Sequence, residues 1–378
     1  MSSTARQQIY LDFNASTPID PRVASVMQHT LENAHGNPSS SHWAGAPARA
    51  IVESARQKIA SLLACKPGEI VFTSGGSESN NQVLKGVFYA RQTAKVHIIT
   101  SRVEHPAIVE PCRFLERLGA EITWLPVDAT GRINADDLRQ SITADTALIS
   151  IMHANNEVGT LQPIEECAQI AREHGIPIHT DAAQSIGKVP TKVDDLGVDF
   201  LTIAGHKLYA PNGIGALFIR EGTVLEPLIH GGGHELGRRA GTESALLAAA
   251  LGEACKLADD LSDMAGIETL RDRLWTALKE ACGDRVVLNG HPTMRLPNTL
   301  NISFTGYTGG ELLAQLPELA ASTGSACHAD RVELSPVLQA MGISQEVGAG
   351  SVRFSLGRTT TSEEIEAVIK RLVPLVAR

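Results

Sequence analysis

The chain has 378 residues, of which 43% are hydrophobic and 20% charged, with a formal net charge of −9. This composition is ample for packed globular domains, and the acidic balance argues against nucleic acid or an anionic membrane as partner. The six cysteines are scattered without a C-x-x-C pair, the N-terminus lacks an apolar leader, and no apolar run spans a membrane. We therefore expect a soluble, cytoplasmic protein with reduced thiols and no metal site.

Short apolar strands alternate with helical patterns through the first two thirds of the chain. The β-rich runs are 69–74, 95–100, 121–127, 146–153, 176–181, 199–204 and 214–219. Helical patterns follow the first four runs, and the fourth of these helices stops at Gly175, a residue type favoured just past helix ends. Buried strands separated by helices predict an α/β fold with a mostly parallel sheet that is covered on both faces.

From about residue 250 the pattern changes to long Ala/Leu-rich helices and amphipathic segments such as EEIEAVIKRLVPLV. This change predicts a second, smaller domain. In parallel sheets ligands bind beyond the carboxyl ends of the strands, near helix N-termini. Polar residues that directly follow the predicted strands are therefore the candidates for a site.

Lys207 stands where one buried strand emerges, in VDFLTIAGHKLYAP. An isolated lysine is nearly always a solvated charge, so a covalent role needs further residues to support it. TSGGSESNN (73–81) follows another strand and opens a helix, and its free amides favour an anion such as phosphate. It is neither a Walker A loop nor G-x-G-x-x-G. A simple glycine-rich turn with Ser77 as the helix cap is the alternative.

Asp181 ends a third apolar strand, in HTDAAQS. It is either a helix cap or the acidic partner of a protonated pyridine nitrogen. Pyridoxal phosphate needs such a carboxylate, a Schiff-base lysine and a phosphate cup. Because all three follow strands here, the sequence favours pyridoxal phosphate with Lys207 as its lysine.

Three more polar residues follow strands or turns near these positions. His105, in SRVEHPA, is a candidate to stack on the cofactor ring and handle protons, or merely starts a helix. Asn156 and Gln184 are candidates to hydrogen-bond the phenolic oxygen of the cofactor, with capping or turn roles as the alternatives.

Cys327 lies in ASTGSACHAD among small residues that bury little surface, which predicts a mobile or tightly turning loop. Free cysteines are usually small buried hydrophobes, but Cys327 has no core-like neighbours. His328 or a helix N-terminus would raise its thiolate fraction, so Cys327 is the best nucleophile candidate. Arg353, in SVRFSLGR, is suited to clamp a carboxylate, with a structural ion pair as the alternative.

With these residues in view, the sequence resembles the cysteine desulfurase and selenocysteine lyase family, fold-type I pyridoxal-phosphate enzymes of the class V aminotransferase group. Eleven motifs in the family's order carry the likeness: YLDFNASTP, GNPSSSH, FTSGGSESNN, EHPA, NNEVG, HTDAAQSIGK, GHKLYAP, HGGGHE, RAGTES, GSAC and RFSLGRTTT. The resemblance implies a large cofactor-binding domain over residues 15–250. It also implies a smaller α+β domain, formed by residues 1–14 and 251–378, that carries the cysteine loop.

The resemblance also implies roles for individual residues. Lys207 would carry the cofactor, Asp181 would pair its ring nitrogen, His105 would stack on the ring, and Asn156 and Gln184 would flank the ring oxygen. Gly76, Ser77 and His206 would serve the phosphate, with Thr242 reaching across from a second subunit of a homodimer. Arg353 and Asn14 would bind the substrate, and Cys327 would receive the sulfur.

The expected reaction removes sulfur from L-cysteine, leaving L-alanine and a persulfide on Cys327 for a sulfur-acceptor protein of unknown identity. The alternatives are a selenocysteine lyase acting on L-selenocysteine and, more distantly, an aminotransferase or a non-enzymatic sulfur-carrier module. Three departures bear on them. Ala204 replaces a phosphate-binding serine of many relatives, CHAD is similar to selenocysteine lyases, and the chain stops at RLVPLVAR without the extension that docks an iron–sulfur scaffold.

Overall fold

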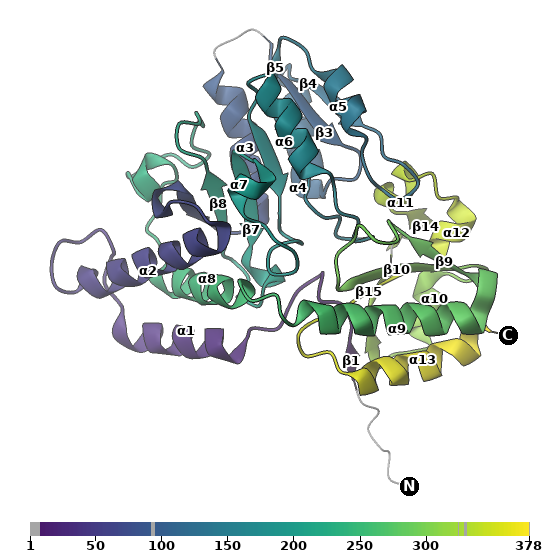
Figure 1. Cartoon of the computed structure of the whole chain (residues 1–378). Helices are drawn as coiled ribbons and strands as arrows, with labels where there is room; N and C mark the ends of the chain where they lie inside the picture. Colours follow the sequence, from purple (N-terminus) through teal and green to yellow (C-terminus); the bar gives the residue numbers. More distant parts are fainter. Residues whose placement is uncertain (1–7, 92–94, 324, 329–330, 378) are drawn as a thin grey trace.

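The computed structural model describes residues 8–91, 95–323, 325–328 and 331–377, and for 325–328 and 331–333 it gives the backbone path alone. In this part of the chain a seven-stranded sheet has the order β2-β8-β7-β6-β5-β3-β4 (Figure 1). Its strands are β2 (Ile70–Thr73), β3 (His97–Ser101), β4 (Glu121–Leu125), β5 (Thr146–Ser150), β6 (Ile178–Asp181), β7 (Phe200–Ala204) and β8 (Gly215–Ile219). β8 runs antiparallel to both neighbours, and the remaining pairs are parallel. The predicted strands and the mostly parallel sheet are confirmed.

Helices cover both faces of this sheet, as its continuous apolar strands require. On β7 successive side chains point to opposite faces, so Phe200 joins one apolar cluster and Leu201 the other. One face packs against α3 (Gly76–Ala90) and α4 (Pro106–Glu116). The other faces α2 (Gly45–Leu63), α5 (Ala135–Ser141), α6 (Ile164–Glu173), α7 (Val193–Leu196) and α8 (Ala245–Ala258), with α1 (Pro21–Asn33) outside them. Among the described helices, none has both the length and the apolar character needed to cross a membrane.

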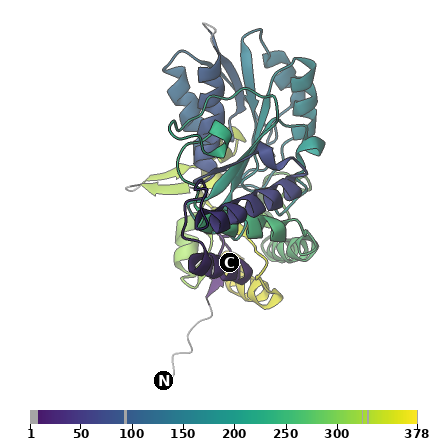
Figure 2. The ribbon, with the colours of Figure 1, turned by 90° about the vertical axis from the view of Figure 1, so that its left-hand side faces the viewer.

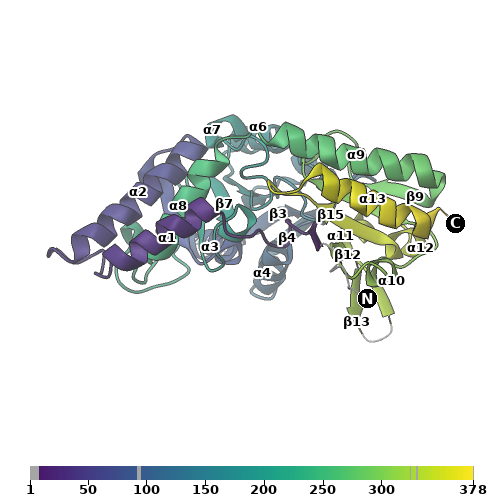
Figure 3. The same cartoon turned by 90° about the horizontal axis from the view of Figure 1, so that it is seen from below.

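A third apolar cluster surrounds a smaller antiparallel sheet of order β12-β15-β10-β9. Its strands are β9 (Val286–Asn289), β10 (Thr299–Phe304), β12 (Ser322–Thr323) and β15 (Ser351–Ser355). Two long helices, α9 (Met264–Cys282) and α13 (Ser362–Val376), lie side by side against it (Figures 1 and 3). The N-terminal strand β1 (Ile9–Tyr10) joins this part by pairing with β11 (Leu319–Ala320).

The division into domains at residues 14/15 and 250/251 stays a prediction. Ile9 and Leu11 pack in the third cluster, around the smaller sheet, which supports assigning the N-terminal segment to the smaller domain. Helix α8 continues to Ala258 within the cluster of the large sheet that contains Leu201, so we propose a domain boundary that follows this helix.

The segment around Cys327 contains two paired strands. The backbone forms a two-stranded antiparallel ribbon of β13 (Ser325–His328) and β14 (Arg331–Leu334), in which Cys327 is paired with Val332. The ribbon projects from the smaller part of the molecule (Figures 2 and 3). Short helices α10 (Gly309–Ala314), α11 (Pro336–Ala340) and α12 (Gln345–Ala349) complete this region. The prediction of a mobile or tightly turning loop stays a prediction: residues 325–328 form a strand through backbone hydrogen bonds, and residues 324, 329 and 330 lie outside the described residues.

Candidate active site

A cavity of about 530 Å³ lies at the carboxyl ends of β2, β6 and β7. The predicted site residues that line it are Asn14, Gly76, Ser77, His105, Asn156, Asp181, Gln184, His206, Lys207 and Arg353. Thr242 is exposed and does not line this cavity. The side chain of Cys327 lies outside the described part of the structure. The fold thus gathers residues from four βα connections, from the connection between β7 and β8, and from both ends of the chain.

The start of α3 forms a cradle suited to an anion. Gly75 adopts φ 150° and ψ −178°, a conformation open essentially to glycine, and thereby turns the chain into the helix. The amides of Gly76 and Ser77 have no acceptor among the described residues, and both residues line the cavity. Free amides and the helix dipole favour a phosphate here.

Glu78, the acidic residue beside this cradle, is bound by other donors. Glu78 accepts hydrogen bonds from the Ser74 amide at 2.8 Å and from Arg239 at 2.9 Å. Although burial opposes it, these hydrogen bonds lower the pKa of Glu78. Its charge is therefore neutralised locally by Arg239. Ala204, which replaces the expected serine, lines the cavity, and Ser74 and Ser77 are the hydroxyls in the cradle.

Asp181 is fixed at the end of β6 by two donors. Asn80 Nδ2 donates to Oδ2 at 2.7 Å, and the Ala183 amide donates to Oδ1 at 2.9 Å. The carboxylate is buried and lines the cavity. Sequence reasoning missed Asn80, although it stands within the quoted FTSGGSESNN motif.

Lys207 closes a short 3₁₀ turn, Gly205–Lys207, directly after β7. Its Nζ donates to the backbone oxygens of Asn14 at 2.7 Å and Ala15 at 2.6 Å. Burial, assisted by the positive charge of Arg353, lowers the pKa of Lys207 to about 8. A substantial fraction of this amine is therefore neutral and nucleophilic near pH 8.

We predict that pyridoxal phosphate attaches to the apoprotein with a pH dependence set by Lys207. A neutral amine is the reactive form, so the rate should rise as pH increases through about 8 and level off above it. Stopped-flow absorbance on cofactor-free protein from pH 6 to 10 measures this profile. An apparent midpoint near 10, that of an ordinary lysine, would show that the cavity does not perturb Lys207.

Two histidines line the cavity in neutral form. His105 caps α4, and its Nδ1 accepts the Ala107 amide at 3.1 Å, which leaves the proton on Nε2. Loss of surrounding water lowers the pKa of His105. Desolvation, assisted by the charge of Lys207, lowers the pKa of His206 to about 4.

Arg353 lies on β15 and is buried beside the cavity. It donates to the Asn156 oxygen at 2.9 Å, to Asp12 at 2.7 Å and to Ser322 Oγ at 3.0 Å. Its Nε has no partner among the described residues. Three of the five N–H donors of the guanidinium are thus engaged, and one on Nη1 and the one on Nε remain. The predicted alternatives are both present, since Arg353 forms an ion pair with Asp12 as well.

Both ends of the β13–β14 ribbon are attached to residues next to the cavity. Before the ribbon, Ser322 on β12 contacts Arg353. After it, Ser335 Oγ donates to Glu157 Oε2 at 2.5 Å, one residue beyond cavity-lining Asn156. The backbone that carries Cys327 therefore begins and ends at the cavity rim. Sequence reasoning found no sign of these contacts, since they join residues far apart in the chain.

The cavity suits pyridoxal phosphate on the chemistry of its side chains and backbone donors. Unpaired amides at the start of α3 match a phosphate, and a buried carboxylate at Asp181 matches a protonated ring nitrogen. Lys207 supplies an amine whose pKa suits covalent attachment. These groups face one cavity, so the residues present fit this cofactor.

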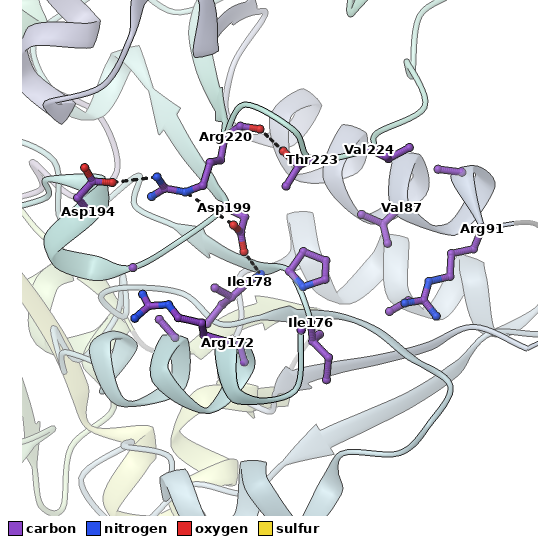
Figure 4. Close-up of a pocket in the computed structure, with 17 residues that line it drawn as sticks. Val87, Arg91, Arg172, Ile176, Ile178, Asp194, Asp199, Arg220, Thr223 and Val224 are labelled. Carbon is purple, nitrogen blue, oxygen red and sulfur yellow. Dashed lines mark hydrogen bonds and ion pairs between the residues drawn. The ribbon is translucent and has the colours of Figure 1, made fainter.

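A larger cavity of about 830 Å³ lies at the opposite end of the sheet strands (Figure 4). Three arginines line it, Arg91, Arg172 and Arg220. Arg220 binds Asp194 at 2.9 Å and lies 3.7 Å from Asp199, and it donates to the Val198 oxygen. Asp199 also accepts the Ile178 amide at 2.9 Å. These charges serve one another and the backbone, so this cavity gathers no chemistry comparable to that around Lys207.

Comparison with known proteins agrees with this geometry. The family described as Aminotransferase class-V matches residues 9–368. A cysteine desulfurase IscS of Dictyoglomus turgidum is 46% identical over 377 residues, which cover 99% of this chain and 95% of that protein. A solved NifS-like protein superposes with a TM-score of 0.92 at 35% identity, covering 98% of this chain and 100% of that one. SspA in complex with cysteine gives a TM-score of 0.83 at 38% identity, covering 93% and 99%.

These likenesses extend over nearly the whole chain and exceed what a shared fold alone would give. The chain belongs to the class V aminotransferase family, and within that family to the cysteine desulfurases. Both are families of pyridoxal-phosphate enzymes with the fold-type I architecture seen here. The predicted family, fold class and cofactor are confirmed.

Proposed function

We propose that the protein is a pyridoxal-phosphate-dependent cysteine desulfurase that converts L-cysteine to L-alanine and retains the sulfur on Cys327. The convergence of Lys207, Asp181 and the start of α3 on one cavity supports this most strongly. The relatives named for this activity, and the SspA structure that contains cysteine, support the same substrate. Measuring alanine and sulfide released from L-cysteine by the purified protein tests the proposal.

The cofactor, when bound, supplies an electron sink that stabilises negative charge at the substrate α-carbon. Lys207 would hold it through Nζ, the amides of Gly76 and Ser77 with His206 would bind its phosphate, and Asp181 would keep its ring nitrogen protonated. His105 would stack on the ring, while Asn156 and Gln184 would hydrogen-bond its phenolic oxygen. Arg353, which lines the cavity, binds the substrate carboxylate. Lys207 Nζ, with a pKa of about 8, would take the α-proton.

Cys327 is the proposed sulfur acceptor. Its thiolate attacks the substrate sulfur, so an S–S bond forms and the C–S bond breaks. The electron pair of the broken bond stays with the substrate carbon, which takes up a proton and leaves as alanine. No external oxidant or reductant is needed, and a separate acceptor protein of unknown identity would remove the sulfur. The ribbon is attached next to the cavity, through the contacts of Ser322 with Arg353 and of Ser335 with Glu157. This attachment supports the proposal that Cys327 reaches the substrate.

Asn14 is part of the proposed substrate site. Its side chain already donates to Thr299 Oγ1 at 2.8 Å and accepts from Asn298 at 3.0 Å, while its backbone oxygen accepts from Lys207. Asn14 is thus engaged with the scaffold on its side chain. Its proposed contribution is to hold the N-terminal segment as the cavity wall nearest Lys207.

Asp181→Asn should retain the fold but lower alanine release about 100-fold, because a neutral amide cannot hold the ring nitrogen protonated and a charged hydrogen bond is lost. Cofactor affinity should fall as well. Steady-state kinetics and cofactor titration measure both effects. Asp195→Asn, at an exposed position of α7, is the matched control and should behave as wild type. Full activity and occupancy in Asp181→Asn would contradict the role.

A homodimer is also proposed. Thr242 lies outside the cavity of its own chain, and in the proposed dimer it contacts the cofactor phosphate bound by the second subunit. Large apolar side chains are exposed nearby: Trp43 is 81% and Leu236 77% exposed, and their loops are joined by Ser39 Oγ and His234 Nδ1 at 3.3 Å. Light scattering of wild type and Trp43→Asp tests this, and a wild-type monomer would contradict it.

A cytoplasmic location belongs to the same proposal. Cys65, Cys112, Cys167, Cys255 and Cys282 are free thiols in the described structure. Free thiols suit a reducing compartment. Cell fractionation tests this location.

A further inference from the structure

Lys188 lies beneath the cavity and is not accounted for by the proposed roles. It stands four residues after Gln184, in the turns that follow β6. Its Nζ donates to Gln184 Oε1 at 3.1 Å and to Asn14 Oδ1 at 3.4 Å. Among the described residues no carboxylate forms an ion pair with it. A cation is thus held by two amide oxygens of the cavity wall.

An ammonium can only donate hydrogen bonds, so Lys188 decides which way two ambiguous amides face. With Oε1 held by Lys188, Nε2 of Gln184 points the other way and donates to the Asn14 oxygen at 2.9 Å. Lys207 Nζ donates to that same oxygen at 2.7 Å. When a ligand draws Lys207 away, the Nε2 donor of Gln184 remains oriented beside the place that Lys207 leaves.

The amines of Lys188 and Lys207 lie close enough for their charges to interact. The charged groups around the two amines are Lys207, Arg353 and Arg358 on the cationic side and Asp12 and Asp181 on the acidic side. Both lysines line a small cavity of about 20 Å³. Burial, assisted by the charges of Lys207 and Arg353, lowers the pKa of Lys188 to about 7. An anionic oxygen bound at Gln184 would restore its full charge.

We propose that Lys188 is a positioning residue that presents the Gln184 donor to the phenolic oxygen of the bound cofactor and places a positive charge behind it. This inference rests on the proposed function. A nearby cation disfavours protonation of neighbouring groups. Lys188 therefore keeps the cofactor-linked nitrogen of Lys207 more acidic than it would otherwise be.

The test is a pH titration of the absorbance of the bound cofactor in the resting holoenzyme, without substrate. Lys188→Met keeps the length of the side chain but removes the charge and the donor. We expect its titration midpoint to rise by about one pH unit or more. Lys188→Arg keeps the charge and should shift the midpoint much less. Lys192→Met removes an exposed lysine from the same region and should leave the midpoint unchanged.

A purely structural role predicts a different result, namely a lower melting temperature in Lys188→Met with an unchanged titration midpoint, and that would overturn the inference. If Lys188→Met does not fold, Lys188→Gln, which also lacks the charge, decides by the same titration. A wild-type protein that takes up no pyridoxal phosphate would overturn the proposed function and this inference together. If the wild type takes up pyridoxal phosphate and Lys188→Met has the titration midpoint of the wild type, this inference alone is overturned.

Discussion

Lys207→Ala is expected to lower alanine release from L-cysteine by about 1,000-fold or more, because it removes both the covalent anchor and the proposed proton acceptor. The amine that is lost lies in the cavity, donates to the Asn14 and Ala15 oxygens and has a pKa of about 8. The second expected result is that borohydride no longer fixes the cofactor to the chain. Kinetics and mass spectrometry of the reduced protein measure the two effects separately.

Lys192→Ala is the matched control for this experiment, since Lys192 is an exposed lysine outside the cavity. It should retain both activity and borohydride fixation. Cofactor fixed by borohydride to the Lys207→Ala chain would show that another amine is the anchor. Lys188 is the first such amine to examine, because its Nζ donates to Asn14 Oδ1, on the residue whose backbone oxygen accepts from Lys207.

Cys327→Ala should lower alanine release from L-cysteine by orders of magnitude while leaving cofactor uptake intact. The cavity residues proposed to bind the cofactor mostly follow the strands of the large sheet, whereas Cys327 lies on the projecting ribbon. The variant therefore separates sulfur acceptance from cofactor chemistry. Alanine release and the absorbance of bound cofactor, measured on the same preparation, report on each.

Cys65→Ala is the control, since burial raises the pKa of the Cys65 thiol to about 12 and makes it a poor nucleophile. Selenocysteine distinguishes the alternative activity. A selenol leaves more readily than a thiol, so Cys327→Ala should lose less turnover on L-selenocysteine than on L-cysteine. Unchanged turnover of L-cysteine would remove Cys327 from the mechanism, and equal losses on both substrates would remove the argument from selenium.

The large sheet and much of the cavity could be predicted because their signals are local. Strands buried on both faces, such as Phe200–Ala204, appear as continuous apolar runs, and the polar residue after each run must lie at one edge of a parallel sheet. Lys207 and Asp181 follow this rule directly. Their convergence needed only strand order and direction, which the alternation of strands and helices largely dictates.

The contacts that complete the site could not be predicted, because they depend on the packing of distant segments. Arg353 and Asp12 are 341 residues apart and meet only because the N-terminal segment lies against β15. The Glu157–Ser335 contact likewise joins the two parts of the molecule. The pairing of β13 with β14 was missed for a related reason, since a segment of small residues has no apolar alternation to indicate a strand.

The central claim, that sulfur from L-cysteine passes to Cys327, is tested most directly by mass spectrometry of the wild-type holoenzyme. The protein is mixed with one equivalent of L-cysteine in the absence of reductant, alkylated and digested. The account predicts the mass of one added sulfur atom on the peptide that contains Cys327, with one alanine released per modified chain. Alanine released with Cys327 unmodified, or the added sulfur found on Cys65, Cys112, Cys167, Cys255 or Cys282 in its place, would contradict it.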